Sequence, residues 1–137
     1  MVVVNWKGEM AFEAVPPSGK KFVMDSFPEE GMETAGPTPL ETFLCAAAAC
    51  SAMDVISILK KKQQKVSAYR VEIDGDRPEP GQFPRPYTSL RIRHIVTGDE
   101  IDPAAVARAV ELSDTKYCSV LATLRIGPKI ESDWSIE

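Results

Sequence analysis

Positive charge is scarce in this sequence, and its scarcity excludes whole classes of function. The 137 residues include 16 lysines and arginines against 20 aspartates and glutamates, so the net charge is −4. Domains that bind nucleic acids usually present a basic face, and basic segments attract anionic membranes. We therefore expect no nucleic acid and no membrane among the partners of the protein.

The pattern of a targeting segment is also lacking. The first residues, MVVVNWKGEM, contain no basic segment followed by a long apolar stretch, as a signal peptide would. The longest apolar run, residues 40–59, contains Asp54, whose charge would be costly near the centre of a bilayer. These observations predict a cytoplasmic protein, whose thiols are reduced at rest.

Histidine and cysteine, which most zinc sites use, are few. The chain has one histidine and three cysteines, Cys45, Cys50 and Cys118, whose spacing matches no zinc-binding pattern. Cys45 and Cys50 lie in a segment with a helical pattern, where five residues amount to a rotation of about 140°. These two cysteines therefore face different ways and cannot pair with one another. We expect no metal site and no bound cofactor.

What the sequence does contain is a succession of strand and helix patterns over a length typical of one domain. We expect a single domain over residues 1–137, with an α+β fold in the order βββ-α-ββ-α-β. Alternating apolar residues and turn signals mark the strands, and a period of 3.6 marks the helices. The expected strands are residues 1–6, 8–15, 20–26, 66–76, 87–98 and 128–137; the expected helices are 38 to about 60–64 and 102–117, with a short helix or turn over 118–125.

The first helix has a clear start and an unusual surface. Thr38, Pro39 and Glu41 form the pattern of a capping box, with Thr38 as the N-cap. From residue 40 to residue 59 the helix is apolar on nearly all sides, as helices buried at the centre of a protein are. One chain of this length has little material to surround such a helix, so we expect a homodimer.

Two of the expected strands offer an apolar face to the helices. In residues 87–98 that face consists of Leu90, Ile92, His94 and Val96. In residues 66–76 it consists of Val66, Ala68, Val71 and Ile73, with one slip in the alternation between Ala68 and Val71. A histidine on such a face is more simply a core or edge residue than a catalytic one.

The cysteines have several possible roles. Cys45 is most simply a small core residue, because free cysteine is commonly buried. Cys50 and Cys118 lie in helical surroundings that could meet across the core, and a disulfide is possible if their Cα atoms come within about 4.4–6.8 Å. A thiolate there could attack a peroxide, become a sulfenic acid and condense with the second thiol. Two buried, unreactive cysteines are the alternative.

The segments around these two cysteines carry a family resemblance. Cys50 lies in GPTPLETFLCAAAACSAMDVISILKKK, and Cys118 lies in ELSDTKYCSVLATL, at the end of the run VTGDEIDPAAVARAVELS. In this order, the segments resemble the OsmC/Ohr family of osmotically inducible and organic hydroperoxide resistance proteins. The resemblance covers nearly the whole chain.

The resemblance implies a thiol-dependent peroxidase that reduces hydroperoxides, including organic ones. Cys50 would react with the peroxide, and Cys118 would resolve the sulfenic acid to a disulfide. An external thiol or dithiol would then reduce that disulfide. The fold it implies is an intertwined homodimer with antiparallel sheets around long central helices. The alternative function is a redox-sensing or small-ligand-binding module without enzymatic activity.

Two positions differ from the family's pattern. Well-studied branches have an acid directly after the proline that opens the helix, whereas this chain has Leu40 there and Glu41 one residue later. Those branches also hold the thiolate with an N-terminal arginine, whereas no arginine precedes Arg70 here. The possible substitutes are Lys20, Lys21, Arg77 and Arg85.

Asp54 follows Cys50 by one helical turn. Its charge would raise the pKa of a nearby thiol, or its carboxylate could orient a cation or cap a backbone group. Glu41 is explained by the capping box. We expect Glu41, Asp54 and Arg85 as possible supporting residues around Cys50 and Cys118.

Overall fold

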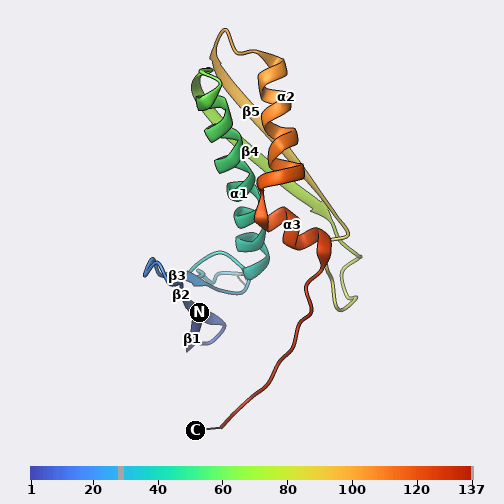
Figure 1. Ribbon diagram of the computed structural model, residues 1–137. Helices are drawn as coiled ribbons and strands as arrows, with labels where there is room; N and C mark the ends of the chain where they lie inside the picture. Colours follow the sequence, from blue (N-terminus) through green and yellow to red (C-terminus); the bar gives the residue numbers. More distant parts are fainter. Residues whose placement is uncertain (28–29, 137) are drawn as a thin grey trace. The chain divides into compact units, whose positions relative to one another are not determined.

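The computed structural model describes residues 1–27 and 30–136, which form two compact units, Met1–Cys45 and Ala46–Glu137. Figure 1 shows the elements along the chain. Strands and helices follow one another as the α+β prediction requires, up to the third helix. The fold class is therefore confirmed, while a single domain over residues 1–137 stays a prediction.

The first unit contains a three-stranded antiparallel sheet. Its strands are β1 (Val3–Gly8), β2 (Ala11–Val15) and β3 (Phe22–Met24), in the spatial order β1-β2-β3. The predicted meander is thus confirmed. Ala14 in the central strand is buried, whereas the apolar side chains of the edge strand β1 are mostly exposed.

The long helix α1 (Pro39–Lys61) begins with the predicted capping box. The Glu41 N–H donates to Thr38 Oγ1 at 3.2 Å, and the Thr38 N–H donates to Glu41 Oε2 at 2.7 Å. Each residue thereby satisfies a backbone donor that the first helical turn leaves unpaired. Lys60 and Lys61 lie in the last turn, where cations favour the negative end of the helix dipole.

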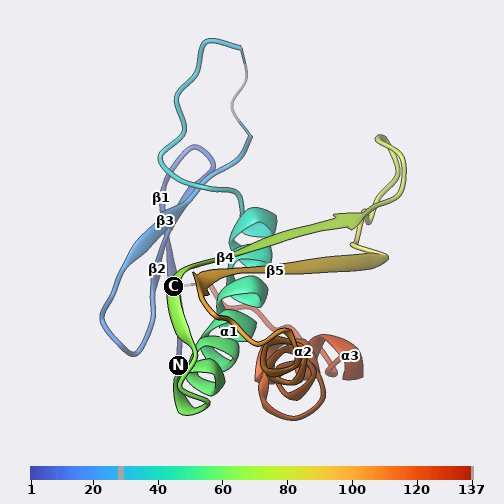
Figure 2. The same ribbon diagram turned by 90° about the horizontal axis from the view of Figure 1, so that it is seen from above.

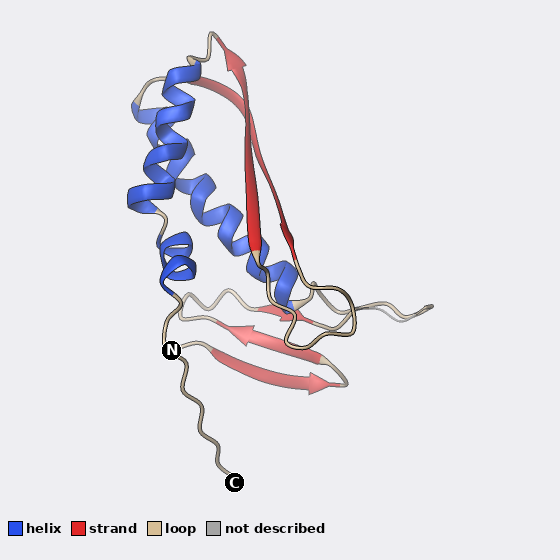
Figure 3. Cartoon of the chain, turned by 90° about the vertical axis from the view of Figure 1, so that its right-hand side faces the viewer, coloured by secondary structure: helices blue, strands red, loops and turns tan. Residues whose placement is uncertain are grey.

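The second unit is built on a long antiparallel hairpin. Its strands β4 (Lys65–Asp76) and β5 (Ser89–Asp99) pair from Lys65↔Asp99 to Asp76↔Ser89. The strands run side by side across α1 (Figure 2). Helices α2 (Pro103–Leu112) and α3 (Ser119–Ile126) lie with α1 on one face of the hairpin (Figure 3). Asp102 caps α2 as predicted, and its carboxylate accepts from the Ala104 N–H at 2.9 Å.

The core of this unit consists of two apolar clusters along α1. One is formed by Val55 and Leu59 with Ala105 and Ala109 of α2. The other is formed by Ala47 with Cys118 and Leu121. Hairpin side chains cover both clusters: Val66, Tyr69 and Val96 over the first, Ile73 and Ile92 over the second.

One inward residue of β4 was assigned wrongly. The pairing with β5 shifts register between Val66 and Ala68, as at a β-bulge. The bulge therefore interrupts the alternation of inward and outward side chains before Ala68, and not after it as predicted. Tyr69 therefore packs on the core, and Ala68 is exposed. On β5 the predicted inward set, His94 included, is at least partly buried.

The predicted final strand is wrong for the described part of the tail. Residues 128–136 have no regular structure, and Glu137 lies outside the described residues. Ile130, Trp134 and Ile136 are 85%, 84% and 87% exposed. A strand needs a neighbour for its backbone hydrogen bonds, and the two described sheets contain only β1 to β5. Apolar composition alone does not supply such a neighbour.

Helix α1 is covered on one side only. Its buried residues recur every fourth position, at Ala47, Ser51, Val55 and Leu59, whereas Met53 is 69% exposed. The helix is long and apolar enough to cross a membrane by length and composition, a test that core helices of soluble proteins also pass. The homodimer that would cover the other side stays a prediction.

Candidate thiol site

The structure brings Cys50 and Cys118 together. Cys118 is 3% exposed and belongs to the cluster with Ala47 and Leu121. Cys50 is half-buried and packs against the same cluster from α1. The two cysteines are 68 residues apart in the sequence, and they meet because the start of α3 packs against α1. The roles of the two thiols stay predictions.

Cys118 is positioned by the start of helix α3. It is the N-cap residue, and its sulfur accepts from the Leu121 N–H at 3.5 Å. Burial nevertheless raises the pKa of the Cys118 thiol, with the Leu121 N–H opposing this and the neighbouring Cys50 adding to it. Cys118 therefore carries its proton at neutral pH.

Cys45 is exposed, so its assignment as a core residue is wrong. The rotation of about 140° between Cys45 and Cys50 explains the difference, because Cys50 faces the core of the second unit. In the first unit Cys45 borders an open depression of about 540 Å³ with Phe27 and Glu41. All three cysteines are free thiols.

Glu41 acts in the structure as a capping residue. Its carboxylate accepts from both the N–H and the hydroxyl of Thr38, at 2.7 and 2.9 Å. The hydrogen bond from the Thr38 backbone lowers the pKa of Glu41 below its ordinary value. Glu41 belongs to the first unit, whereas Cys50 and Cys118 belong to the second. A supporting role at the thiols stays a prediction.

Arg85 braces the loop between β4 and β5. Its Nε donates to the carbonyl of Pro78, and the guanidinium of Arg77 donates to the carbonyl of Arg85 at 3.0 and 2.8 Å. These bonds satisfy backbone carbonyls of a loop that has no ladder of its own. They give both arginines a structural role, and a role at the thiols stays a prediction.

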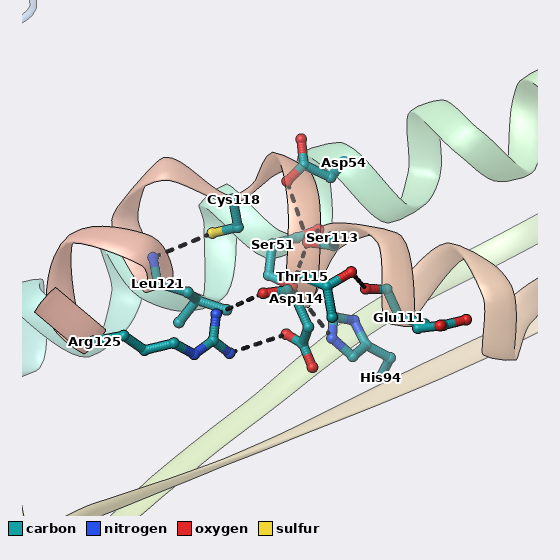
Figure 4. Close-up of polar contacts among 10 residues, drawn as sticks. All are labelled: Ser51, Asp54, His94, Glu111, Ser113, Asp114, Thr115, Cys118, Leu121 and Arg125. Atoms are coloured by element: carbon teal, nitrogen blue, oxygen red, sulfur yellow. Dashed lines mark hydrogen bonds and ion pairs between the residues drawn. The ribbon is translucent and has the colours of Figure 1, made fainter.

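Asp54 is held by a serine from another element. Ser113 lies directly after α2, and its hydroxyl donates to Asp54 Oδ2 at 3.1 Å. Figure 4 shows Ser113 between Asp54 and Ser51. Asp54 thus takes part in a side-chain network instead of capping a backbone group.

That network continues into the hairpin and was not foreseen from the sequence. Ser51 Oγ lies 3.0 Å from Ser113 Oγ and 3.4 Å from Nε2 of His94. The Tyr69 hydroxyl lies 2.6 Å from Nδ1 of His94. We call the set Asp54, Ser113, Ser51, His94 and Tyr69 the polar chain. It crosses the unit from α1 to the hairpin beside the two apolar clusters.

One arrangement of protons gives every side chain of the polar chain a partner. When Ser113 donates to the Asp54 carboxylate, which is the shorter of its two donor contacts, it accepts from Ser51. Ser51 then accepts from the Nε2–H of His94, and the bare Nδ1 of His94 accepts from Tyr69. Every hydrogen points towards Asp54, and His94 is neutral.

The titration of the two aromatic members agrees with this arrangement. Burial lowers the pKa of His94, and Asp114 opposes this only in part. Burial raises the pKa of Tyr69 to about 12. Both groups are therefore uncharged near neutral pH.

One signal in the sequence could have revealed the polar chain. Ser51 stands four residues after Ala47 and four before Val55, on the stripe that packs into the core. A serine on a buried stripe needs a hydrogen-bond partner. Its partner Ser113 is 62 residues away, and only the tertiary fold identifies it.

Ser113 also connects the polar chain to Cys118. Residues Ser113–Tyr117 form a π-helical turn, and the Cys118 N–H donates to the Ser113 carbonyl at 2.9 Å. Such wide turns are rare in proteins, and those that occur are often found at functional sites. The side chain of Ser113 thus contacts α1, while its carbonyl anchors the backbone of Cys118.

Comparison with known proteins agrees with the fold. Residues 31–133 match the family described as OsmC-like protein. Protein YhfA of Escherichia coli strain K12 is 38% identical over 133 residues, which are 97% of this chain and 95% of that protein. A hypothetical protein from Aquifex aeolicus VF5 is 30% identical, with a TM-score of 0.75 over 93% of this chain and 87% of that one.

The same fold occurs in a more distant solved structure. An OsmC-like hydroperoxide resistance protein from Jannaschia sp. CCS1 has a TM-score of 0.60 at 18% identity, over 97% of this chain and 89% of that one. The family match spans most of the sequence, and the identity to YhfA extends over almost all of it. On these two grounds, the chain belongs to the OsmC-like protein family.

Proposed function

We propose that the protein is a thiol-dependent peroxidase that reduces organic hydroperoxides through Cys50 and Cys118. The observation that carries this proposal is the packing of both cysteines in one apolar cluster. Membership of a family in which some structures are named hydroperoxide resistance proteins supports it. We further propose that it acts as a cytoplasmic homodimer.

The reaction needs two thiols and one peroxide. The Cys50 thiolate attacks the outer oxygen of the hydroperoxide, the O–O bond breaks, and the departing alkoxide takes up a proton to become an alcohol. The Cys50 sulfenic acid is then attacked by the Cys118 sulfur. The S–S bond forms, the S–O bond breaks, and the hydroxide leaves as water with the Cys118 proton. An external dithiol returns both cysteines to thiols by exchange.

Burial supports this division of roles. Cys50 is the more accessible sulfur, whereas Cys118 is 3% exposed and remains protonated because its pKa is raised. A resolving thiol needs only to meet its neighbour, not the solvent. The side chains around the pair are apolar: Ala47, Ile73, Ile92, Val120, Leu121 and Leu124. Such walls favour an organic hydroperoxide over hydrogen peroxide.

The test is peroxide consumption with dithiothreitol as reductant, comparing cumene hydroperoxide with hydrogen peroxide. We expect faster turnover of the organic substrate, loss of turnover in Cys50→Ser, and unchanged turnover in Cys45→Ser. The Cys45 variant is the matched control because it removes an exposed thiol on the same helix. Oxidation of Cys50 at the rate of free cysteine would contradict the proposal. It would instead favour the redox-sensing or ligand-binding module.

A further inference from the structure

Two members of the polar chain lie close to the cysteines in the sequence. Ser51 follows Cys50 directly on α1, and Ser113 opens the π-helical turn that ends before Cys118. The two serine hydroxyls lie 3.0 Å apart, and both serines are 0% exposed. A buried hydrogen bond therefore joins the two backbone segments that carry the cysteines.

Ser113 is the residue where the two segments are fixed to one another. Its hydroxyl contacts Ser51 and Asp54 of α1, and its carbonyl accepts from the Cys118 N–H at 2.9 Å. A π-helical turn is a local departure from regular helix geometry. A buried side-chain contact at its first residue limits how far the turn can shift along α1.

We propose that Ser113 is a positioning residue that holds Cys118 against Cys50 and so sets how readily their disulfide closes. The proposal rests on the proposed function for its biological use, but its geometry does not depend on the peroxide step. Ser51 and Asp54 act through Ser113, and none of the three touches a reacting atom.

Disulfide closure is sensitive to small displacements. The bond requires a narrow range of Cα and Cβ separations. A misplacement of about 1 Å can lower the rate of a positioned reaction by about 100-fold. Removing the Ser113 hydroxyl leaves Asp54 without this donor and Ser51 without its acceptor, so the π-helical turn loses its contact with α1.

The test measures the effective concentration of the Cys50 and Cys118 thiols towards one another. The full chain is equilibrated with mixtures of reduced and oxidised dithiothreitol, and the disulfide fraction is read by mass after thiol alkylation. The exchange transfers two electrons and two protons between the dithiol and the protein disulfide. We expect Ser113→Ala to lower the effective concentration by about tenfold or more.

The matched control is Thr115→Ala. Thr115 lies in the same π-helical turn, but its hydroxyl donates to the carbonyl of Glu111 at 2.7 Å and is exposed. We expect this variant to stay within about twofold of the wild type, since its bond does not reach α1. Ser51→Ala provides a second variant. We expect it to lower the effective concentration less than Ser113→Ala does, because Ser113 still donates its hydrogen bond to Asp54.

A second readout separates positioning from general loss of stability. With excess cumene hydroperoxide, a displaced Cys118 resolves the Cys50 sulfenic acid more slowly, so more Cys50 proceeds to sulfinic acid. We expect that fraction to rise in Ser113→Ala while the initial sulfenic acid forms at the wild-type rate.

The outcomes are distinguishable from those of the proposed function. A wild type that does not react with peroxide overturns the peroxidase proposal, and the dithiothreitol equilibrium still tests Ser113. Effective concentrations within twofold of the wild type in both Ser113→Ala and Ser51→Ala would overturn the positioning role. A lower melting temperature alone, without a change in effective concentration, would overturn it as well.

Discussion

The Tyr69 hydroxyl lies 2.6 Å from Nδ1 of His94, although the two residues belong to different strands of the hairpin. This bond fixes the acceptor side of the imidazole, and Ser51 fixes the donor side. His94 is therefore a neutral, half-buried residue with both ring nitrogens hydrogen-bonded. That arrangement explains its place on the apolar face of β5 and makes stability depend on pH.

We expect the free energy of unfolding to fall as the pH drops below about 6.5, the ordinary pKa of histidine. Burial lowers the pKa of His94 in the folded state, so below pH 6.5 the unfolded chain binds a proton that the folded chain does not. The loss is at most about 1.4 kcal/mol per pH unit. The free energy of unfolding keeps falling from the pKa of His94 in the unfolded chain down to its lower pKa in the folded chain.

Urea denaturation at pH 7.5, 6.5 and 5.5 measures this dependence. The control is His94→Gln, whose amide does not titrate and can donate to Ser51. We expect a shallower pH dependence in this variant over the same range. Equal slopes for the variant and the wild type would show that His94 is not the group responsible.

A second prediction concerns the other end of the polar chain. Tyr69→Phe removes the hydroxyl and leaves Nδ1 of His94 without its donor. An unsatisfied buried acceptor costs about 1–3 kcal/mol. We expect a decrease of that size in the free energy of unfolding. Tyr117→Phe, at a side chain that is 49% exposed, should change it by less than about 0.5 kcal/mol.

The sequence predicts local features of this fold well and tertiary ones less so. The capping box at Thr38 and the N-cap at Asp102 depend on residues a few positions apart, and both were predicted correctly. The bulge between Val66 and Ala68 depends on pairing with β5, so the alternation alone misplaced Ala68 and Tyr69.

The candidate site shows the same division. The family resemblance selected Cys50 and Cys118, which do pack together. The polar chain was missed because its bonds join residues from four elements, and a serine carries no sign of its partner. For the tail, the apolar residues such as Trp134 predict a strand, but the described sheets offer it no strand to pair with.

The two thiols should behave differently when each is removed. Cys118→Ser should complete one oxidation and stop at a sulfenic acid on Cys50, open to over-oxidation. Cys50→Ser should form no sulfenic acid, because Cys118 is buried and its pKa is raised. Single-turnover trapping with a sulfenic-acid reagent and peptide mapping distinguishes the cases. Trapping at Cys118 in Cys50→Ser, together with none at Cys50 in Cys118→Ser, would reverse the roles.

In the wild type, peroxide treatment should join Cys50 to Cys118 and leave Cys45 as a thiol. Cys45 faces away from Cys50 on the same helix, and it is exposed where the other two pack in the core. Peptide mapping without reduction identifies the link. A dominant link through Cys45 would contradict the assignment.

The last prediction is that the protein is an obligate homodimer. Helix α1 buries one stripe against its own chain and leaves the apolar side chain of Met53 69% exposed, between the exposed residues Ala49 and Ser57. Obligate interfaces bury on the order of 2,000 Å² or more and are more apolar than other surfaces. Sedimentation at micromolar concentration should therefore give about twice the chain mass of 15.0 kDa. Met53→Glu would place a charge in that interface and should weaken association by about tenfold or more, since unpaired buried charges are costly. Met53→Leu keeps the apolar surface and should associate as the wild type does. A folded wild-type monomer at micromolar concentration would refute the dimer, and an unchanged Met53→Glu dimer would place its interface elsewhere.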